Sequence, residues 1–144
     1  NLTVTVSYGI QAGMKNIRKL VQMAAEEDMF VRLDMEDHRV TTQTIDVVLA
    51  LHNEGLTNVG TVLQGRLFRT LSDIDTLETE LGPAADYRIC KGIYLEPKDI
   101  SFTGYRDIVD ATNAAIDRMF SAGAYVGVAS HDQPVIDHTL SALT

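Results

Sequence analysis

The stretch that decides the expected fold is Phe30-Val31-Arg32-Leu33-Asp34-Met35-Glu36. Successive side chains of a β-strand point to opposite faces, so this stretch has one apolar face and one charged face. The apolar face is Val31, Leu33 and Met35, and the charged face is Arg32, Asp34 and Glu36. A strand that serves only packing rarely places three charges on an interior face, so the pattern predicts a barrel strand with chemistry at its C-terminal end. A solvated face of an edge strand is the alternative.

Four other stretches read as strands, and the spacing between strands is about 28 residues, longer before the last. They are Leu2–Ser7, Val59–Gln64, Tyr87–Tyr94 and Tyr125–Ser130, and Phe30–Met35 is the strand quoted above. Helical patterns separate them at Met14–Glu27, Thr42–Asn53, Ser72–Leu81 and Ile108–Ala122, and a last helix starts near Pro134. This alternation predicts the α/β class, with five parallel βα units that form part of a (βα)8 barrel of the TIM type. An open doubly wound sheet is the alternative, although no GxGxxG or GxxxxGK[ST] motif follows a strand.

Composition excludes several classes of function. The 144 residues suit one ordinary domain, and 45% of them are hydrophobic. A formal charge of -8 disfavours binding to nucleic acid or to a broad anionic surface. The single cysteine, Cys90, excludes an internal disulfide and suggests a reducing, cytoplasmic compartment. The chain starts in a strand without Met and stops within an apolar helical pattern, so we expect a piece of a longer protein.

Polar residues gather at the ends of three further strands. Gln64 ends the third strand, and Arg88, Cys90, Gly92 and Tyr94 share one face of the fourth. Glycine inside a strand suggests close approach by a ligand or by another backbone. A bulge in which Arg88 pairs with a carboxylate of the second strand is the structural alternative. Ser130, His131 and Asp132 follow the fifth strand, where Ser and Asp could equally cap the final helix.

A metal site is one hypothesis for these residues. Asp34, Glu36 and His131 would offer oxygen and imidazole ligands to Mg, Mn or Zn in a barrel hydrolase or lyase. The chain has no HxH or HExxH spacing, and Arg88 and Lys91 would compete for the same carboxylates. These observations weigh against a metal.

The second hypothesis comes from resemblance. Four blocks resemble the proline dehydrogenase family in order and spacing, and together they cover nearly the whole chain: Phe30-Val-Arg-Leu-Asp34-Met-Glu36-Asp, Val59-Gly-Thr-Val-Leu-Gln64, Arg88-Ile-Cys-Lys91-Gly92-Ile-Tyr94-Leu-Glu96-Pro and Val128-Ala-Ser130-His131-Asp132. The resemblance implies a distorted β/α barrel with FAD at the C-terminal ends of its strands. It further implies oxidation of L-proline to 1-pyrroline-5-carboxylate by hydride transfer to FAD, with a quinone as electron acceptor. Peripheral contact with a membrane stays open.

The resemblance also implies roles for individual residues. Near the substrate it places Asp34, and over the proline ring it places Tyr94. Against the flavin ring and its linker it places Gln64, Arg88, Lys91 and Gly92. Toward the phosphates and the dinucleotide half of FAD it places Arg106, Ser130, His131 and Asp132. Hydride transfer is the chemistry of the cofactor, so no nucleophile or catalytic dyad is expected.

Three departures from the family pattern matter. Thr5 stands where the family has a lysine, and Gly65-Arg66 stands where Ala-Tyr usually follows the glutamine. The family helix that carries a tyrosine and two arginines for the proline carboxylate is not part of these residues. We therefore expect residues 1–144 to be the central part of a catalytic barrel, truncated at both ends, with weak FAD binding and little turnover in isolation. A catalytically dead barrel fragment is the alternative, and Thr5 favours it.

Overall fold

The computed structural model describes residues 2–5 and 10–144, which divide into two compact units, Asn1–Val62 and Leu63–Thr144. The first unit contains β1 (Leu2–Thr5), α1 (Ile10–Glu26), β2 (Val31–Asp34), α2 (Thr41–Asn53) and the start of β3 (Val59–Gln64). The second unit contains the end of β3, then α3 (Thr70–Leu81), β4 (Asp86–Cys90), α4 (Tyr105–Ser121), β5 (Tyr125–Val128) and α5 (Gln133–Ala142). Short 3-10 turns, His38–Val40 and Gly82–Ala84, precede α2 and β4.

In the first unit the strands pair in the order of the sequence. β2 runs parallel to both of its neighbours, and Val31 is opposite Leu2 on β1 and Val59 on β3. The side chain of Asn58 donates to the carbonyls of Val21 (3.1 Å) and Met29 (3.0 Å), which ties α1 to the start of the strands. Neighbouring strands that are also consecutive in the chain are typical of a β/α barrel, whereas a doubly wound sheet reverses its strand order.

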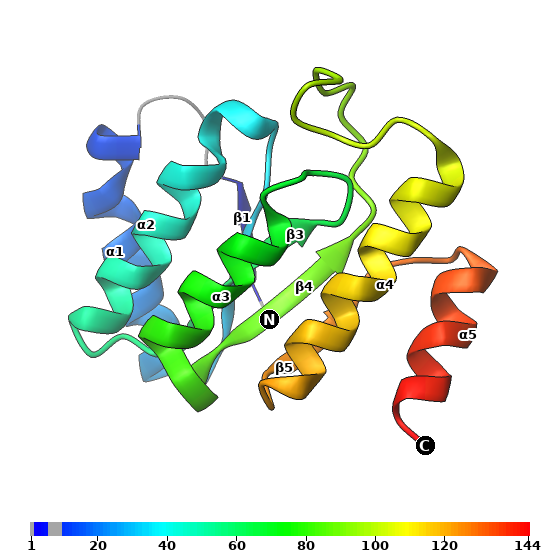
Figure 1. The fold of residues 1–144 in the computed structure, drawn as a ribbon. Coiled ribbons are helices and arrows are strands. Elements are labelled where there is room, and N and C mark those ends of the chain that lie inside the picture. The colour runs from blue at the N-terminus through cyan, green and yellow to red at the C-terminus, as the bar shows by residue number, and fades with distance from the viewer. Residues whose placement is uncertain (1, 6–9) are drawn as a thin grey trace. The chain divides into compact units, whose positions relative to one another are not determined.

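In the second unit β4 and β5 are parallel, with Asp86 opposite Tyr125. Figure 1 shows α3 and α4 on the same face of β4. Tyr87 of β4 is buried on this face, where its burial raises its pKa and the charges of Glu78 and Arg118 act on it. The guanidinium of Arg118 in turn joins α4 to Asp75 (2.8 Å) and Glu78 (2.9 Å) of α3. The apolar layer between the strands and helices of this unit includes the fully buried Leu77, Ile89, Ile116 and Met119.

The predicted alternation of strands and helices is confirmed, but three strands are shorter than predicted, and β2 lacks one residue of the prediction at each end. β4 ends at Cys90 instead of Tyr94, and β5 ends at Val128 instead of Ser130. The backbone after Cys90 leaves the extended conformation at Gly92, whose φ of 98° lies in the left-handed region. Gly92 and Tyr94 therefore belong to a loop and not to the strand. The last two residues of the predicted strand Leu2–Ser7 lie outside the described residues.

Helix α3 starts two residues before the predicted Ser72. Its first turn is stabilised by the hydroxyl of Thr70, which donates to the carbonyl of Gln64 (2.5 Å), and by an ion pair between Arg69 and Asp73 (2.8 Å). Ser72 thus lies inside the helix and does not cap it. The start of α3 is set by the end of β3, a contact that the helical pattern in the sequence did not reveal. None of the helices in the described part of the chain is long and apolar enough to cross a membrane.

Gly65 marks the closest approach between the end of β3 and α4. A Cβ placed on Gly65 would lie 2.1 Å from the hydroxyl oxygen of Thr112 and 2.7 Å from the Thr112 Cα. Thr112 is itself fully buried, and its hydroxyl donates to the carbonyl of Ile108 (2.7 Å). The backbone atom in this contact cannot rotate away, so glycine is required here by packing.

We expect Gly65→Ala to lower the free energy of unfolding by about 1–3 kcal/mol, the range for overpacking a filled interior. The measurement is urea denaturation of the wild type and the variant. Gly127→Ala is the matched control, because a Cβ there would lie 3.6 Å from the Tyr87 carbonyl, an ordinary contact. Equal losses for the two variants would contradict the close approach at Thr112.

Candidate functional site

The C-terminal ends of β3 and β4 meet around Gln64 and Gly92. The Gln64 side chain is only 3% exposed, and a Cβ built on Gly92 would lie 2.8 Å from its amide oxygen. The backbones of the two segments are joined directly, because Gly65 N–H donates to the Cys90 carbonyl (2.8 Å). The prediction of a ligand or another backbone close to Gly92 is thus met in a different form, because the approaching group is a buried side-chain amide from the neighbouring strand end.

Alternation along β4 separates its helix-facing residues from its site-facing residues. Tyr87 and Ile89 are buried on the side of α3 and α4, so Arg88 and Cys90 point to the opposite face. Both are partly buried, and the thiol of Cys90 lies 3.6 Å from the carbonyl of Leu63. The prediction that Arg88 and Cys90 share a face of the strand is confirmed. Gly92 and Tyr94, which were predicted on the same face, lie instead in the loop that follows the strand.

Arg66 is a site residue for which the sequence analysis offered no role. It is 8% exposed, and its guanidinium donates to the carbonyls of Tyr94 and Phe102, the latter at 3.4 Å. The sequence signal was available: an arginine directly after a buried strand end, where the resemblance expected tyrosine. Nothing in the sequence indicated that this guanidinium would be buried among carbonyl groups.

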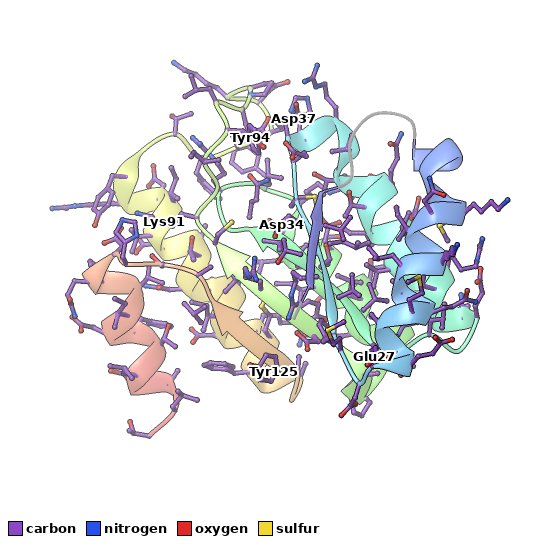
Figure 2. The ribbon with its side chains drawn as sticks, turned by 180° about the vertical axis from the view of Figure 1, so that it is seen from behind. Glu27, Asp34, Asp37, Lys91, Tyr94 and Tyr125 are labelled. Atoms are coloured by element: carbon purple, nitrogen blue, oxygen red, sulfur yellow. The ribbon has the colours of Figure 1, made fainter. Side chains whose placement is uncertain are left out.

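Lys91, Tyr105 and Asp132 form a hydrogen-bonded group. The Lys91 ammonium pairs with Asp132 and lies 5.4 Å from the centre of the Tyr105 ring, and the Tyr105 hydroxyl donates to Asp132 (2.9 Å). The hydrogen bond from Lys91, followed by that from Tyr105, lowers the pKa of the Asp132 carboxyl. The bond to Asp132 also raises the pKa of the Tyr105 hydroxyl. The group connects the segments that follow β4 and β5, and Figure 2 shows Lys91 in this region.

Asp132 occupies the N-cap position of α5, but its side chain makes no capping hydrogen bond. The alternative reading of Asp132 as an ordinary helix cap is therefore wrong, because Lys91 and Tyr105 bind both carboxylate oxygens. Ser130 does act locally, since its hydroxyl accepts the backbone N–H of Asp132 (3.1 Å). His131 is exposed between them.

Tyr94 and Arg106 reach the surface. Tyr94 is partly buried in the loop beyond the C-terminal end of β4, whereas Tyr125 lies at the opposite end of the unit (Figure 2). The backbone of Tyr94 is held by Arg66, whose guanidinium donates to the Tyr94 carbonyl. Arg106 is exposed in the first turn of α4. The structure thus connects Tyr94 to the strand ends through its carbonyl group.

In the first unit Asp34 ends β2, partly buried and opposite Thr5 of β1 in the backbone register (Figure 2). Its neighbour Arg32 is buried, with its guanidinium 3.3 Å from the carbonyl of Thr61 and 4.8 Å from the centre of the Phe30 ring. One of the three charges on this face is therefore used in packing. Among the described residues, no three His, Cys, Asp or Glu side chains are grouped as a metal site, so the metal hypothesis has no cluster to support it.

Comparison with known proteins gives a consistent result. Residues 1–137 match the model of the family described as Proline dehydrogenase. The chain is 36% identical over 130 residues to Proline dehydrogenase of Deinococcus radiodurans, and 33% identical over 125 residues to Proline dehydrogenase 2 of Bacillus subtilis strain 168. These alignments cover 90% and 87% of this chain but 41% and 40% of the relatives. The chain therefore spans about two fifths of their length.

Among solved structures, the chain is similar to proline utilization A from Bdellovibrio bacteriovorus, with a TM-score of 0.89 and 16% identity. A mutant of proline utilization A from Bradyrhizobium japonicum gives a TM-score of 0.86 and 17% identity. The matches cover 99% and 97% of this chain and 18% of each solved chain. This likeness confirms the predicted fold class, part of an α/β barrel.

The Lys91–Asp132 pair predicts a specific pH dependence. Because the folded pKa of Asp132 is lowered, its contribution to stability is complete above the unfolded value of about 3.9 and is lost as the pH falls through the folded value. We expect Asp132→Asn to be less stable than the wild type at pH 7, and the difference in the free energy of unfolding to shrink below about pH 4.

Urea denaturation of both proteins between pH 7 and pH 2.5 measures this difference. Asp110→Asn is the matched control, because Asp110 is an exposed carboxylate of α4 for which the structure shows no hydrogen bond or ion pair. It should give no comparable pH-dependent difference. A loss of stability in Asp132→Asn that is the same at every pH would contradict an ionised role for this carboxylate.

Proposed function

The chain belongs to the proline dehydrogenase family, and we propose that it forms the central part of a flavin-dependent barrel that oxidises L-proline to 1-pyrroline-5-carboxylate. The observation that carries the proposal is the buried Gln64 amide against Gly92 at the ends of β3 and β4. In a β/α barrel this is the end of the strands at which chemistry takes place.

The residues present fit a flavin. Gly92 adopts a positive φ, and a Cβ there would be 2.8 Å from Gln64 Oε1, so the floor beside the amide carries no side chain. Arg88 offers a guanidinium on the site-facing side of β4, and the Gln64 amide can both donate and accept hydrogen bonds. Such a set of donors beside a backbone position without a side chain suits a planar, electron-accepting ring with carbonyl and ring-nitrogen edges.

When bound, FAD would accept the hydride, which carries both electrons of the oxidation. The protein residues would bind the cofactor, orient its ring and stabilise the charge that develops on it. Arg88 stabilises the negative charge that arrives during reduction, and Gln64 orients the ring through its buried amide. Lys91, Gly92, Arg106, Ser130, His131 and Asp132 complete the proposed cofactor-binding set, in which Lys91 and Asp132 act as one neutralised pair.

Substrate roles rest on the family resemblance. For Tyr94 the proposed role is an aromatic wall over the proline ring, and in the loop after β4 its side chain is partly buried and partly accessible to a ligand. For Asp34 the proposed role is near the substrate, consistent with a partly buried carboxylate at a strand end. A quinone acceptor completes the proposed reaction and regenerates the oxidised cofactor.

Arg88→Ala and Gln64→Ala test the cofactor site in the full-length protein. Losing a buried hydrogen bond to a charged or polar group costs about 1.5–3 kcal/mol, so we expect FAD affinity to fall by about 10- to 150-fold, more for Arg88→Ala. Flavin titration followed by fluorescence quenching measures the affinity, and proline-dependent bleaching of the bound flavin measures its reduction.

Arg18→Ala is the control, because the guanidinium of Arg18 pairs with Glu54 (2.6 Å) and has no role in the proposal. It should bind FAD as the wild type does. If Arg88→Ala keeps both its full flavin content and its rate of reduction, Arg88 does not belong to the site. A wild-type protein that binds FAD but is not reduced by proline would contradict the proposed substrate.

A further inference from the structure

The β4–α4 loop, residues 91–104, is attached to the chain segment that follows β3. Arg66 N–H donates to the Lys91 carbonyl (3.1 Å), and Phe102 N–H donates to the Arg66 carbonyl (2.9 Å). Two residues farther on, Phe68 N–H donates to the Ile100 carbonyl (3.0 Å). The main chain of Arg66 therefore holds both the start and the end of the loop.

The side chain of Arg66 holds the middle of the same loop. Its guanidinium donates to the carbonyl of Tyr94 and to that of Phe102 (3.4 Å). The aliphatic part of the side chain supports Gly92, since a Cβ on Gly92 would lie 2.8 Å from Arg66 Cδ and 3.0 Å from Cγ. The loop thus rests on Arg66 along most of its length.

This arrangement has an energetic cost that ordinary packing does not require. Arg66 is 8% exposed, its Nε–H is buried without a hydrogen-bond partner, and the structure shows no carboxylate paired with it in the described residues. Burying a cation among carbonyl groups is unfavourable unless its geometry is used. The planar guanidinium can bind two carbonyl groups in fixed directions at once, which an ammonium cannot do in the same way.

Hydrophobic burial does not hold the part of the loop around Tyr94. Its two neighbours, Ile93 and Leu95, are 87% and 97% exposed. The carbonyl of Tyr94, by contrast, accepts a charge-assisted hydrogen bond from a buried donor. Arg66 therefore supplies a buried, charged donor that holds the Tyr94 backbone.

We propose that Arg66 is a positioning residue, which fixes the β4–α4 loop so that Tyr94 stands at the site. Its functional consequence rests on the proposed function, because that proposal assigns Tyr94 to the proline ring. Arg66 acts through the Tyr94 backbone and does not touch the substrate. The resemblance expected tyrosine at this position, so the device belongs to this chain and is not implied by its family.

The first test needs neither flavin nor proline. Arg66→Lys keeps the charge, and Arg66→Met keeps the aliphatic stem without any donor. Because each lost hydrogen bond is worth about 1 kcal/mol, we expect amide hydrogen exchange at Phe102 and Ile100 to accelerate by about 5- to 30-fold in both variants. Arg118→Lys, which alters an arginine that pairs with carboxylates on α3, should leave exchange in the loop unchanged.

The second test is a double-mutant cycle on proline oxidation by the full-length protein. Arg66→Lys should raise KM for proline by about 5- to 10-fold with little change in kcat, as expected when a mutation removes binding that is equal in the ground and transition states. Tyr94→Ala should also raise KM. In the Tyr94→Ala background, the change at Arg66 should then have little further effect, because the two act through the same contact.

The outcomes separate the two proposals. Unchanged exchange in the loop, or fully additive effects of the two substitutions on KM, would overturn the positioning role of Arg66. Accelerated exchange in a protein whose wild type does not oxidise proline would uphold the control of the loop by Arg66 and refute the proposed function. A loss of flavin in Arg66→Lys with unchanged exchange would show a direct cofactor contact, which also contradicts the proposal.

Discussion

The turn that follows β3 is the constraint on which the site depends. Gly65 lies too close to Thr112 for any side chain, and its N–H bonds to the carbonyl of Cys90 at the end of β4. The close contact fixes the distance between strand end and helix, and the hydrogen bond aligns the two strand ends. Gln64 on one side of this glycine and Arg66 on the other are thereby directed toward Gly92. A single short turn therefore provides the buried amide, the open floor and the support of the following loop.

Charged side chains hold the loops near the strand ends of the second unit. The chain carries a formal charge of -8, yet several cations lie near the strand ends of the second unit. Among the described residues, Arg66 is held by two carbonyl groups, whereas Lys91 is neutralised by Asp132, with Tyr105 as a third member. Arg88 faces the site from β4. Two cations thus hold loops, and Arg88 is the cation that we propose stabilises the negative charge of a reduced flavin.

The relation to proline dehydrogenases is clear in sequence and in fold, although the chain spans only part of its relatives. The departure at Gly65-Arg66 has a structural explanation in this chain. Glycine accommodates Thr112, and Arg66 binds two carbonyl groups of the β4–α4 loop. Thr5, the other departure from the family pattern, is paired with Asp34 in the backbone register of β1 and β2. A family architecture can therefore keep its strand-end residues while the support beneath them changes.

Period-2 and period-3.6 patterns in the sequence determined the order of strands and helices. A strand or helix with one buried face needs apolar residues at regular intervals, and these intervals can be read from the sequence. They also determined that Arg88 and Cys90 share a face of β4 and that Gly92 needs close approach. The end of β4 at Cys90, the start of α3 at Thr70 and the pairing of Lys91 with Asp132 were decided only in three dimensions. Each of these depends on a partner that is distant in the sequence or on a backbone carbonyl, and neither leaves a periodic signal. Arg66 shows the limit most clearly: its identity is visible in the sequence, but its function comes from two carbonyl groups that the folded loop brings to it.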